Sequence, residues 1–209
     1  MLGCDLEINE YLDRLETVLQ SLNTSEVSRL SDQLYERWQH GRYIFVFGNG
    51  GSATTASHLA EDLGKMCVSP DQIGSNGTRR LKVMSLTDNV GWITALANDI
   101  GYDSIFSEQL MHYASPGDLV LAISGSGNSP NVLRAVEWAK SQAIMTFALT
   151  GYDGGKLKQI ADDCIHIPLH DMGMVETVHL ALGHWLVDDL SARVNGSGRY
   201  RSAATISAP

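Results

Sequence analysis

The sequence predicts an α/β fold with a doubly wound, five-stranded parallel sheet and additional N-terminal helices. Short, continuous apolar runs alternate along the chain with segments whose apolar residues follow helical spacing. This alternation is typical of βαβ units and therefore of a parallel sheet. Two of the apolar runs end in polar turns, the glycine turn (48–52) and the serine turn (124–129). Such sheets bind ligands at the carboxyl ends of strands, where the connections switch direction.

Two helices are expected before the first strand. Apolar residues between 5 and 22 follow helical spacing and form a broad stripe. Asn23, with Glu26 three residues later, predicts the N-terminal cap of a second helix, and Gly41 ends that helix. Because the first helix lies outside the βαβ pattern, we expect its stripe to be buried in a helical bundle between subunits. Packing onto its own domain is the alternative.

The remaining elements follow in order along the chain. Strands are expected at 43–47, 81–86, 118–123, 144–149 and 164–168. Helices are expected at 53–65, 89–97, 103–114, 130–142, 156–161 and 174–194. Residues 195–209 have the composition of a disordered tail. We therefore expect a single domain over 1–194, which includes an N-terminal helical extension over 5–40.

The composition argues against several classes of protein. A net charge of −9 argues against a large nucleic-acid interface, and an anionic ligand would need a local cluster of donors. No apolar run approaches the ~20 residues of a membrane span, and the first residues lack the pattern of a secretory signal. The three cysteines are widely spaced and indicate free thiols. We expect a cytoplasmic protein without nucleic-acid or membrane partners.

The serine turn is the most informative stretch, because it follows an apolar run and precedes a helical pattern. The first N–H groups of a helix have no intrahelical partner, and the helix dipole places partial positive charge there. Serine hydroxyls add donors, and glycine allows the backbone to approach phosphate oxygens. The turn lacks the ending of a P-loop, so it indicates a phosphate ester rather than a nucleoside triphosphate. A helix cap in a flexible loop is the alternative.

Acidic and imidazole side chains lie on two predicted helices. His58 and Asp62 are four residues apart, so one helix face could hold a metal ion or pair a base with its orienting group. Glu61 could reach the same side, and a histidine beside a solvated acidic face is the alternative. On the last helix, Glu176 and His184 are eight residues apart, about 12 Å along the axis. Either Glu176 lies before the regular helix, or another subunit supplies one ligand.

Several motifs together resemble the sugar isomerase (SIS) domain, and their order and spacing resemble those of phosphoheptose isomerases. They are Gly48-Asn-Gly-Gly-Ser52, Ala56-Ser-His-Leu-Ala-Glu-Asp62, Ala97-Asn-Asp-Ile-Gly101, Ile123-Ser-Gly-Ser-Gly-Asn-Ser129 and Leu149-Thr-Gly-Tyr-Asp-Gly-Gly155. The resemblance implies a flavodoxin-like SIS sandwich and a homotetramer built partly through the N-terminal helices. It also implies metal-assisted isomerisation of sedoheptulose 7-phosphate to D-glycero-D-manno-heptose 7-phosphate through an enediol or enediolate.

The resemblance also implies a role for each site residue. One zinc ion per subunit would be held by His58, Asp62, Glu176 and His184. Asp62 would be the catalytic base, with His184 and Glu61 as further catalytic groups. The substrate would be bound by Asn49, Gly50, Gly51, Ser52, Asp99, Ser124, Gly125, Ser126, Ser129 and Glu176. We expect the phosphate to dock at the serine turn, and the acid and imidazole groups to meet the sugar carbons a few ångströms away.

Three positions depart from the phosphoheptose isomerase pattern. Asp62 stands where the family carries Glu, Gly125 replaces a hydroxyl residue, and Glu176 replaces Gln. The shorter Asp62 moves its carboxylate by about one C–C bond, and misplacement on the ~1 Å scale can cost roughly 100-fold in rate. Two alternatives therefore stay open. One is an isomerase of another sugar phosphate, and the other is a non-catalytic SIS protein that binds a protein partner, like the relative that binds the replication initiator.

Overall fold

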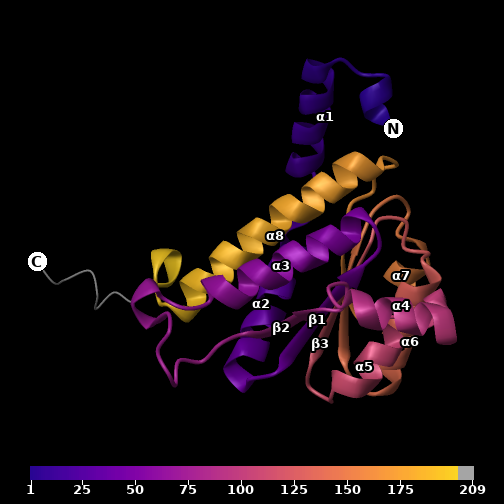
Figure 1. Cartoon of the computed structure of the whole chain (residues 1–209). Helices are drawn as coiled ribbons and strands as arrows, with labels where there is room; N and C mark the ends of the chain where they lie inside the picture. Colours follow the sequence, from indigo (N-terminus) through magenta and orange to yellow (C-terminus); the bar gives the residue numbers. More distant parts are fainter. Residues whose placement is uncertain (202–209) are drawn as a thin grey trace, which may run out of the picture.

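Parallel strands form the central sheet of the computed structural model, which describes residues 1–201 (Figure 1). They are β1 (Tyr43–Gly48), β2 (Lys82–Ser85), β3 (Leu119–Ser124), β4 (Met145–Thr150) and β5 (Asp163–His166). Their order across the sheet is β2-β1-β3-β4-β5, and every pairing is parallel. The predicted α/β class with a five-stranded parallel sheet is therefore confirmed.

Helices cover both faces of this sheet. The covering helices are α2 (Thr24–His40), α3 (Gly51–Met66), α4 (Val90–Asp99), α5 (Ser107–Tyr113), α6 (Pro130–Ser141), α7 (Gly155–Ile160) and α8 (Met172–Val194), and α1 (Ile8–Gln20) precedes them. Short 3₁₀ helices are η1 (Leu2–Cys4), η2 (Pro70–Gln72), η3 (Tyr102–Ser104) and η4 (Gly198–Tyr200). The core on one face is shared with α2, α3 and α8, and the core on the other with α4 to α7. No helix within residues 1–201 is long and apolar enough to cross a membrane.

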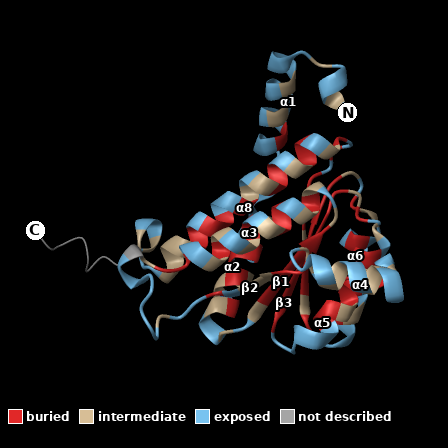
Figure 2. Cartoon of the chain, in the orientation of Figure 1, coloured by how far each residue is buried: buried red, intermediate tan, exposed pale blue. Residues whose placement is uncertain are grey.

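Burial on both faces explains why the strands appear in the sequence as continuous apolar runs. In β1, Ile44 and Val46 pack in the core beneath α2, α3 and α8, whereas Phe45 and Phe47 pack in the opposite core. All four side chains are fully buried, and Figure 2 shows the sheet as the buried centre of the molecule. The alternation of side chains along a strand thus serves two cores at once.

Two helices begin earlier than the apolar pattern indicated. α3 begins at Gly51, inside the glycine turn, and α8 begins at Met172. Asp171 caps α8, because its Oδ1 accepts the Met174 N–H at 2.9 Å, and its Oδ2 accepts the Leu2 N–H at 2.6 Å. Polar and small residues in a first turn hide the start of a helix from a pattern based on apolar spacing.

α1 stands away from the sheet and its covering helices (Figure 1), and most of its surface is exposed (Figure 2). Val18 is buried, but Ile8 and Leu12 are 67% and 51% exposed. An isolated helix of this length is marginal in water, so its stability depends on packing. Much of the apolar stripe that the sequence predicted therefore has no partner within the described chain.

Residues 195–201 differ from the disordered tail that their composition indicated. They include η4, which packs on the end of α8, and the Tyr200 O–H donates to Asp189 Oδ1 at 2.7 Å. The carboxylate that holds this segment, Asp189, belongs to α8, so the composition of the segment itself does not reveal the contact. The rest of the expected tail, 202–209, lies outside the described residues.

Asp189 is buried and gathers several donors around it. Arg193 Nε lies 3.1 Å from its Oδ2, while Arg199 and the Ser31 hydroxyl also contact the carboxylate. Burial alone raises the pKa of Asp189, but the hydrogen bonds from Ser31 and Tyr200 and the two arginine charges outweigh it, so the pKa is lowered. The resulting stability is present above the unfolded pKa of about 3.9 and is lost as the pH falls through the folded value.

We expect Asp189→Asn to lower the free energy of unfolding by about 3 kcal/mol, because two guanidinium groups lose their anion. Asp188→Asn is the matched control, since Asp188 is the exposed neighbour on α8, and it should change stability by less than about 0.5 kcal/mol. Urea unfolding at one protein concentration measures both, and the effect of Asp189→Asn should shrink below about pH 4. Equal effects of the two substitutions would contradict this role of Asp189.

Candidate active site

The glycine turn and the serine turn lie at the carboxyl ends of neighbouring strands. β1 pairs directly with β3, with Gly48 opposite Ile123. From β1 the chain enters α3 on one face of the sheet, and from β3 it enters α6 on the other. The connections therefore diverge between these strands, and this is the switch point at which sheets of order 2-1-3-4-5 bind ligands.

A pocket of about 280 Å³ opens between the two turns. It is lined by Asn49, Gly50, Gly51, Ser52, Ile123, Ser124, Gly125, Ser126, Ser129, Met172 and Glu176. This lining includes every residue predicted to bind substrate except Asp99. Asp99 ends α4 on the exposed surface and accepts a hydrogen bond from Asn98 at 2.7 Å, so the structure does not bring it into the pocket.

The serine turn is held in one shape by its own side chains. The Gly127 N–H donates to Ser124 Oγ at 3.2 Å, and the Asn128 N–H donates to Ser126 Oγ at 3.3 Å. A hydroxyl that accepts a bond keeps its own proton to donate, so both serines can donate to an anion. Ser129 is the N-cap residue of α6, and its side chain makes no capping bond. These hydroxyls lie at the positive end of the helix dipole, an arrangement that is chemically suited to an anion such as phosphate.

Gly127 is the position at which this turn requires a glycine. Its φ is +66°, and a Cβ there would overlap the carbonyl oxygen of Gly154. The Leu157 N–H donates to the Gly127 carbonyl at 2.9 Å, and the Lys156 N–H donates to Asn128 Oδ1 at 3.1 Å. The start of α7 therefore supports the serine turn from behind.

α8 supplies another wall of the pocket. Met172 packs on Gly125, and the Glu176 carboxylate packs on Gly51. Both contacts are so close that a Cβ at either glycine would overlap the facing side chain. Glu176 lies within the regular part of α8, which starts after Asp171. Of the two alternatives for Glu176, a place before the regular helix is therefore excluded, and a ligand from another subunit stays a prediction. In the structure Glu176 is a half-buried carboxylate at the pocket.

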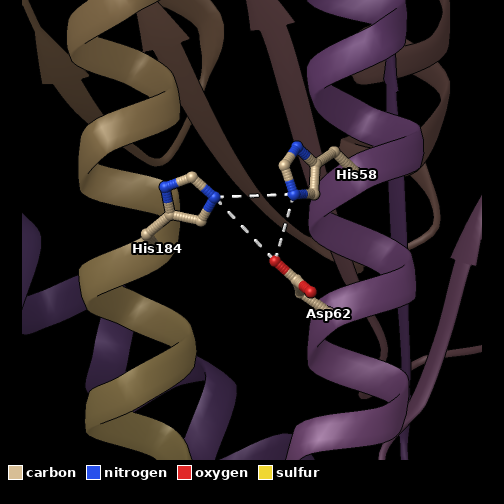
Figure 3. A group of neighbouring side chains, drawn as sticks. All are labelled: His58, Asp62 and His184. Carbon is tan, nitrogen blue, oxygen red and sulfur yellow. Dashed lines mark hydrogen bonds and ion pairs between the residues drawn. The ribbon is translucent and has the colours of Figure 1, made fainter.

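His58, Asp62 and His184, here called the His–Asp group, point toward one another from α3 and α8 (Figure 3). Asp62 Oδ2 lies 3.2 Å from His58 Nε2 and 4.0 Å from His184 Nε2. The two Nε2 atoms are 3.5 Å apart. Asp62 is half-buried and both histidines are exposed, so the group is open to ligands.

The donor types and their spacing fit a zinc ion. Imidazole nitrogen and carboxylate oxygen are zinc ligands, and tetrahedral coordination at about 2.1 Å places ligand atoms about 3.4 Å apart. The separations of 3.2, 3.5 and 4.0 Å lie around that value. Three protein ligands leave one position open, as in catalytic zinc sites. Glu176 is about 12 Å from His184 along α8, so the predicted set of four ligands is reduced to three within one chain.

Glu61 is not a member of the His–Asp group. It pairs with Lys65, whose Nζ lies 2.6 Å from Glu61 Oε1 and 3.2 Å from Asp62 Oδ1. These two contacts, Glu61 first, raise the pKa of Lys65. Asp62 therefore has one oxygen toward a lysine and the other toward the histidines, while Glu61 lines a separate hollow beside β2. The structure thus separates the two acidic residues predicted to be catalytic.

The His–Asp group lies about two helical turns from the pocket. Gly51 and His58 are seven residues apart on α3, and Glu176 and His184 are eight apart on α8, which is about 10 to 12 Å along the axes. Within one chain, the acid and imidazole groups therefore lie farther than a few ångströms from the pocket, and their meeting with the sugar carbons stays a prediction for the assembled protein. Only a ligand that spans two turns of helix reaches both.

His179, which lies on α8 between Glu176 and His184, is a core residue. It is 1% exposed, and its Nε2 lies 3.3 Å from the carbonyl oxygen of Thr150 at the end of β4. Burial lowers the pKa of His179 to about 4, so the ring is neutral at neutral pH. His179 therefore joins α8 to the sheet.

Comparison with known proteins agrees with this arrangement. The family model described as "SIS domain" matches residues 8–151. A probable phosphoheptose isomerase of Thermoplasma volcanium is 32% identical over 181 residues, which are 87% of this chain and 89% of that protein. A phosphoheptose isomerase of Trichlorobacter lovleyi is 39% identical over 165 residues, 79% of this chain and 81% of that protein. The chain belongs to the phosphoheptose isomerase family of SIS domains.

Solved phosphoheptose isomerases share the fold of this SIS domain. The structure from Neisseria gonorrhoeae superposes with a TM-score of 0.79 at 27% identity, over 88% of this chain and 97% of that one. The structure from Francisella tularensis gives 0.76 at 26% identity, over 88% and 95%. Nearly the whole of each solved chain therefore has a counterpart here.

Sequence reasoning missed two residues of the SIS site. Asn131 is buried on the first turn of α6, where an asparagine resembles an ordinary helix cap. Its place directly after the serine turn is the signal that could have found it. Met172 was missed because an isolated apolar residue before a helical pattern has no distinctive spacing. The signal that could have found it is Gly125, because the absence of a side chain there makes room for the Met172 side chain.

We expect Gly127→Ala to weaken the binding of inorganic phosphate at least about tenfold, because the new Cβ overlaps backbone that holds the serine turn. Gly74→Ala is the matched control, since Gly74 also has a positive φ of +82° but nothing within 4 Å of the added Cβ. Isothermal titration calorimetry measures both. Similar affinities for the two variants would show that the serine turn does not bind phosphate.

Proposed function

We propose that this SIS domain is a phosphoheptose isomerase that converts sedoheptulose 7-phosphate to D-glycero-D-manno-heptose 7-phosphate. One observation carries the proposal: α3 and α8 together present a donor-lined pocket at one end and the His–Asp group two turns further along. The pocket suits the phosphate, and the His–Asp group suits proton transfer at C1 and C2. The family relationship supports the same activity.

The spacing favours a long sugar phosphate. With bonds of about 1.5 Å, an extended seven-carbon chain that ends in a phosphate reaches about 9 to 10 Å. This length is comparable with the rise of about 10 to 12 Å from Gly51 to His58 on α3 and from Glu176 to His184 on α8. A triose phosphate held at the serine turn would not reach them.

The reaction moves one proton between neighbouring carbons, and the described side chains supply the groups. The Asp62 carboxylate takes a proton from C1, which yields an enediolate, and the hydroxyl proton on the C1 oxygen moves to the C2 oxygen beside His184. Asp62 then returns its proton to C2, which leaves the aldehyde at C1. Lys65 Nζ lies 3.2 Å from Asp62 Oδ1, on the side of the carboxylate that faces away from the histidines.

The proposal includes zinc held by His58, Asp62 and His184. When bound, zinc polarises the substrate oxygens and stabilises developing negative charge. Glu176 packs on Gly51 in its own chain, so it would become a fourth ligand only to the His–Asp group of another subunit. In its own pocket its carboxylate would accept hydrogen bonds from sugar hydroxyls.

We also propose that residues 1–194 form one domain of a cytoplasmic homotetramer. The exposed apolar residues of α1 support a bundle between subunits. A groove between α1, α2 and α8 could receive such a helix, and it is lined by Leu19, Leu22, Thr24, Val27, Ser28, Leu182 and Trp185. The common core of α2, α3 and α8 supports a single domain, and the free cysteines suit a reducing compartment.

An isomerase of another sugar phosphate is the second candidate. The departures at Asp62, Gly125 and Glu176 support it: Gly125 and Glu176 line the pocket, and Asp62 belongs to the His–Asp group. Turnover of ketose phosphates with five, six and seven carbons would separate the two. A complete acid and imidazole set favours either enzyme over a non-catalytic partner-binding protein.

We expect Asp62→Asn to lower kcat on sedoheptulose 7-phosphate at least about 100-fold with little change in KM, because it removes the base and keeps the shape. Glu61→Gln is the matched control on the next residue and should change kcat/KM less than about threefold. Proton NMR of the aldose product measures both. The reverse pattern would assign the base to Glu61, and no turnover by the zinc-loaded wild type would contradict the proposed function.

We expect His184→Ala to weaken zinc binding at least about 100-fold, because one of three ligands is lost. His112→Ala is the control, since His112 is exposed and packs on Trp92 outside the His–Asp group. Competition with a chromophoric chelator measures the affinity of each variant. Equal affinities of the two variants would contradict this zinc site.

A further inference from the structure

We infer that Asn131 is a positioning residue that fixes Asn49 as a hydrogen-bond donor to the bound sugar phosphate, an inference that rests on the proposed function. Asn49 lies in the glycine turn and lines the pocket, and Asn131 lies on the first turn of α6. Their amides exchange two hydrogen bonds, from Asn49 Nδ2 to Asn131 Oδ1 and from Asn131 Nδ2 to Asn49 Oδ1, each 2.9 Å. Asn131 is 1% exposed, so this pair is held inside the protein.

The backbone of α6 decides which way the pair is oriented. The Val132 N–H donates to Asn131 Oδ1 at 2.9 Å. An N–H donates only to the oxygen of an amide, so Asn131 must place its oxygen there and its NH₂ group toward Asn49. A reversed Asn131 would set donors against each other. The hydrogen bond from the Val132 N–H in α6 therefore fixes the orientation of the Asn131 amide, and the paired hydrogen bonds with Asn131 fix the orientation of the Asn49 amide.

Tyr102 completes the set of partners. Its O–H donates to Asn49 Oδ1 at 3.1 Å, so this oxygen accepts two bonds and has no lone pair left. Asn49 Nδ2 carries two N–H groups and uses one on Asn131. The other N–H is available to a ligand, so Asn49 presents a donor to the pocket. A donor selects an acceptor, such as a hydroxyl or carbonyl oxygen of the sugar phosphate.

The same pair bridges the two halves of the site. Asn49 belongs to the half built on β1, and Asn131 belongs to the helix whose first turn follows the serine turn. The pair therefore fixes the spacing between the group that binds phosphate and the donor that faces the sugar. Loss of Asn131 should affect a ligand that contacts both halves more than it affects phosphate alone.

Isothermal titration calorimetry with sedoheptulose 7-phosphate and with inorganic phosphate tests the inference on the full chain. We expect Asn131→Ala to weaken binding of the sugar phosphate at least about tenfold and binding of inorganic phosphate less than about twofold. Tyr102→Phe should give the same pattern with a smaller effect. Asn23→Ala, which removes an asparagine cap from α2, should leave both affinities unchanged. Equal weakening of both ligands by Asn131→Ala would overturn the positioning role.

A measurement without ligand separates this inference from the isomerase proposal. In protein labelled with ¹⁵N-asparagine, the side-chain amide protons of Asn49 should exchange slowly in the wild type and faster in Asn131→Ala. Tyr102→Phe, a substitution at an exposed residue, provides the same comparison if Asn131→Ala fails to fold. This result requires no turnover, so it holds even if the isomerase assay fails. An Asn49 signal that neither substitution changes would overturn the inference.

Discussion

The divergence of the chain between β1 and β3 is the constraint on which the whole site depends. Because β1 leads to α3 on one face and β3 leads to α6 on the other, the first turns of these helices separate above the sheet. Asn49 lines the resulting crevice on one side, and the serine turn lines it on the other side. α8 closes it with Met172 and Glu176. Every contact proposed for the substrate is therefore a consequence of strand order.

The pairing of α3 with α8 is the second determinant, because the two helices extend this crevice into a longer site. They lie side by side, so Gly51 faces Glu176 near their beginnings and His58 faces His184 two turns later. The helical rise then sets the separation between the pocket and the His–Asp group. The polar groups follow the same division. Neutral donors and the Glu176 carboxylate line the pocket, and His58, Asp62 and His184 gather at the far end.

Much of the fold was predictable because its signals are local. The apolar run of β1 and the polar turn after it lie within a few residues, so the alternation of elements and most pocket residues followed from the sequence. Strand order, the two-turn offset of His184 and the Asn49–Asn131 pair depend on contacts between distant segments, which no local pattern encodes. Glu176 illustrates the difference. Its presence on the last helix was evident, but its contact with Gly51 became evident only when α3 and α8 were seen together.

The most direct test of the account is a crystal structure of the zinc-loaded protein with sedoheptulose 7-phosphate bound. The account predicts phosphate oxygens on the hydroxyls of Ser124, Ser126 and Ser129, and C1 and C2 of the same molecule beside Asp62 and His184. A phosphate bound elsewhere, or reacting carbons held away from these two side chains in every subunit, would contradict it.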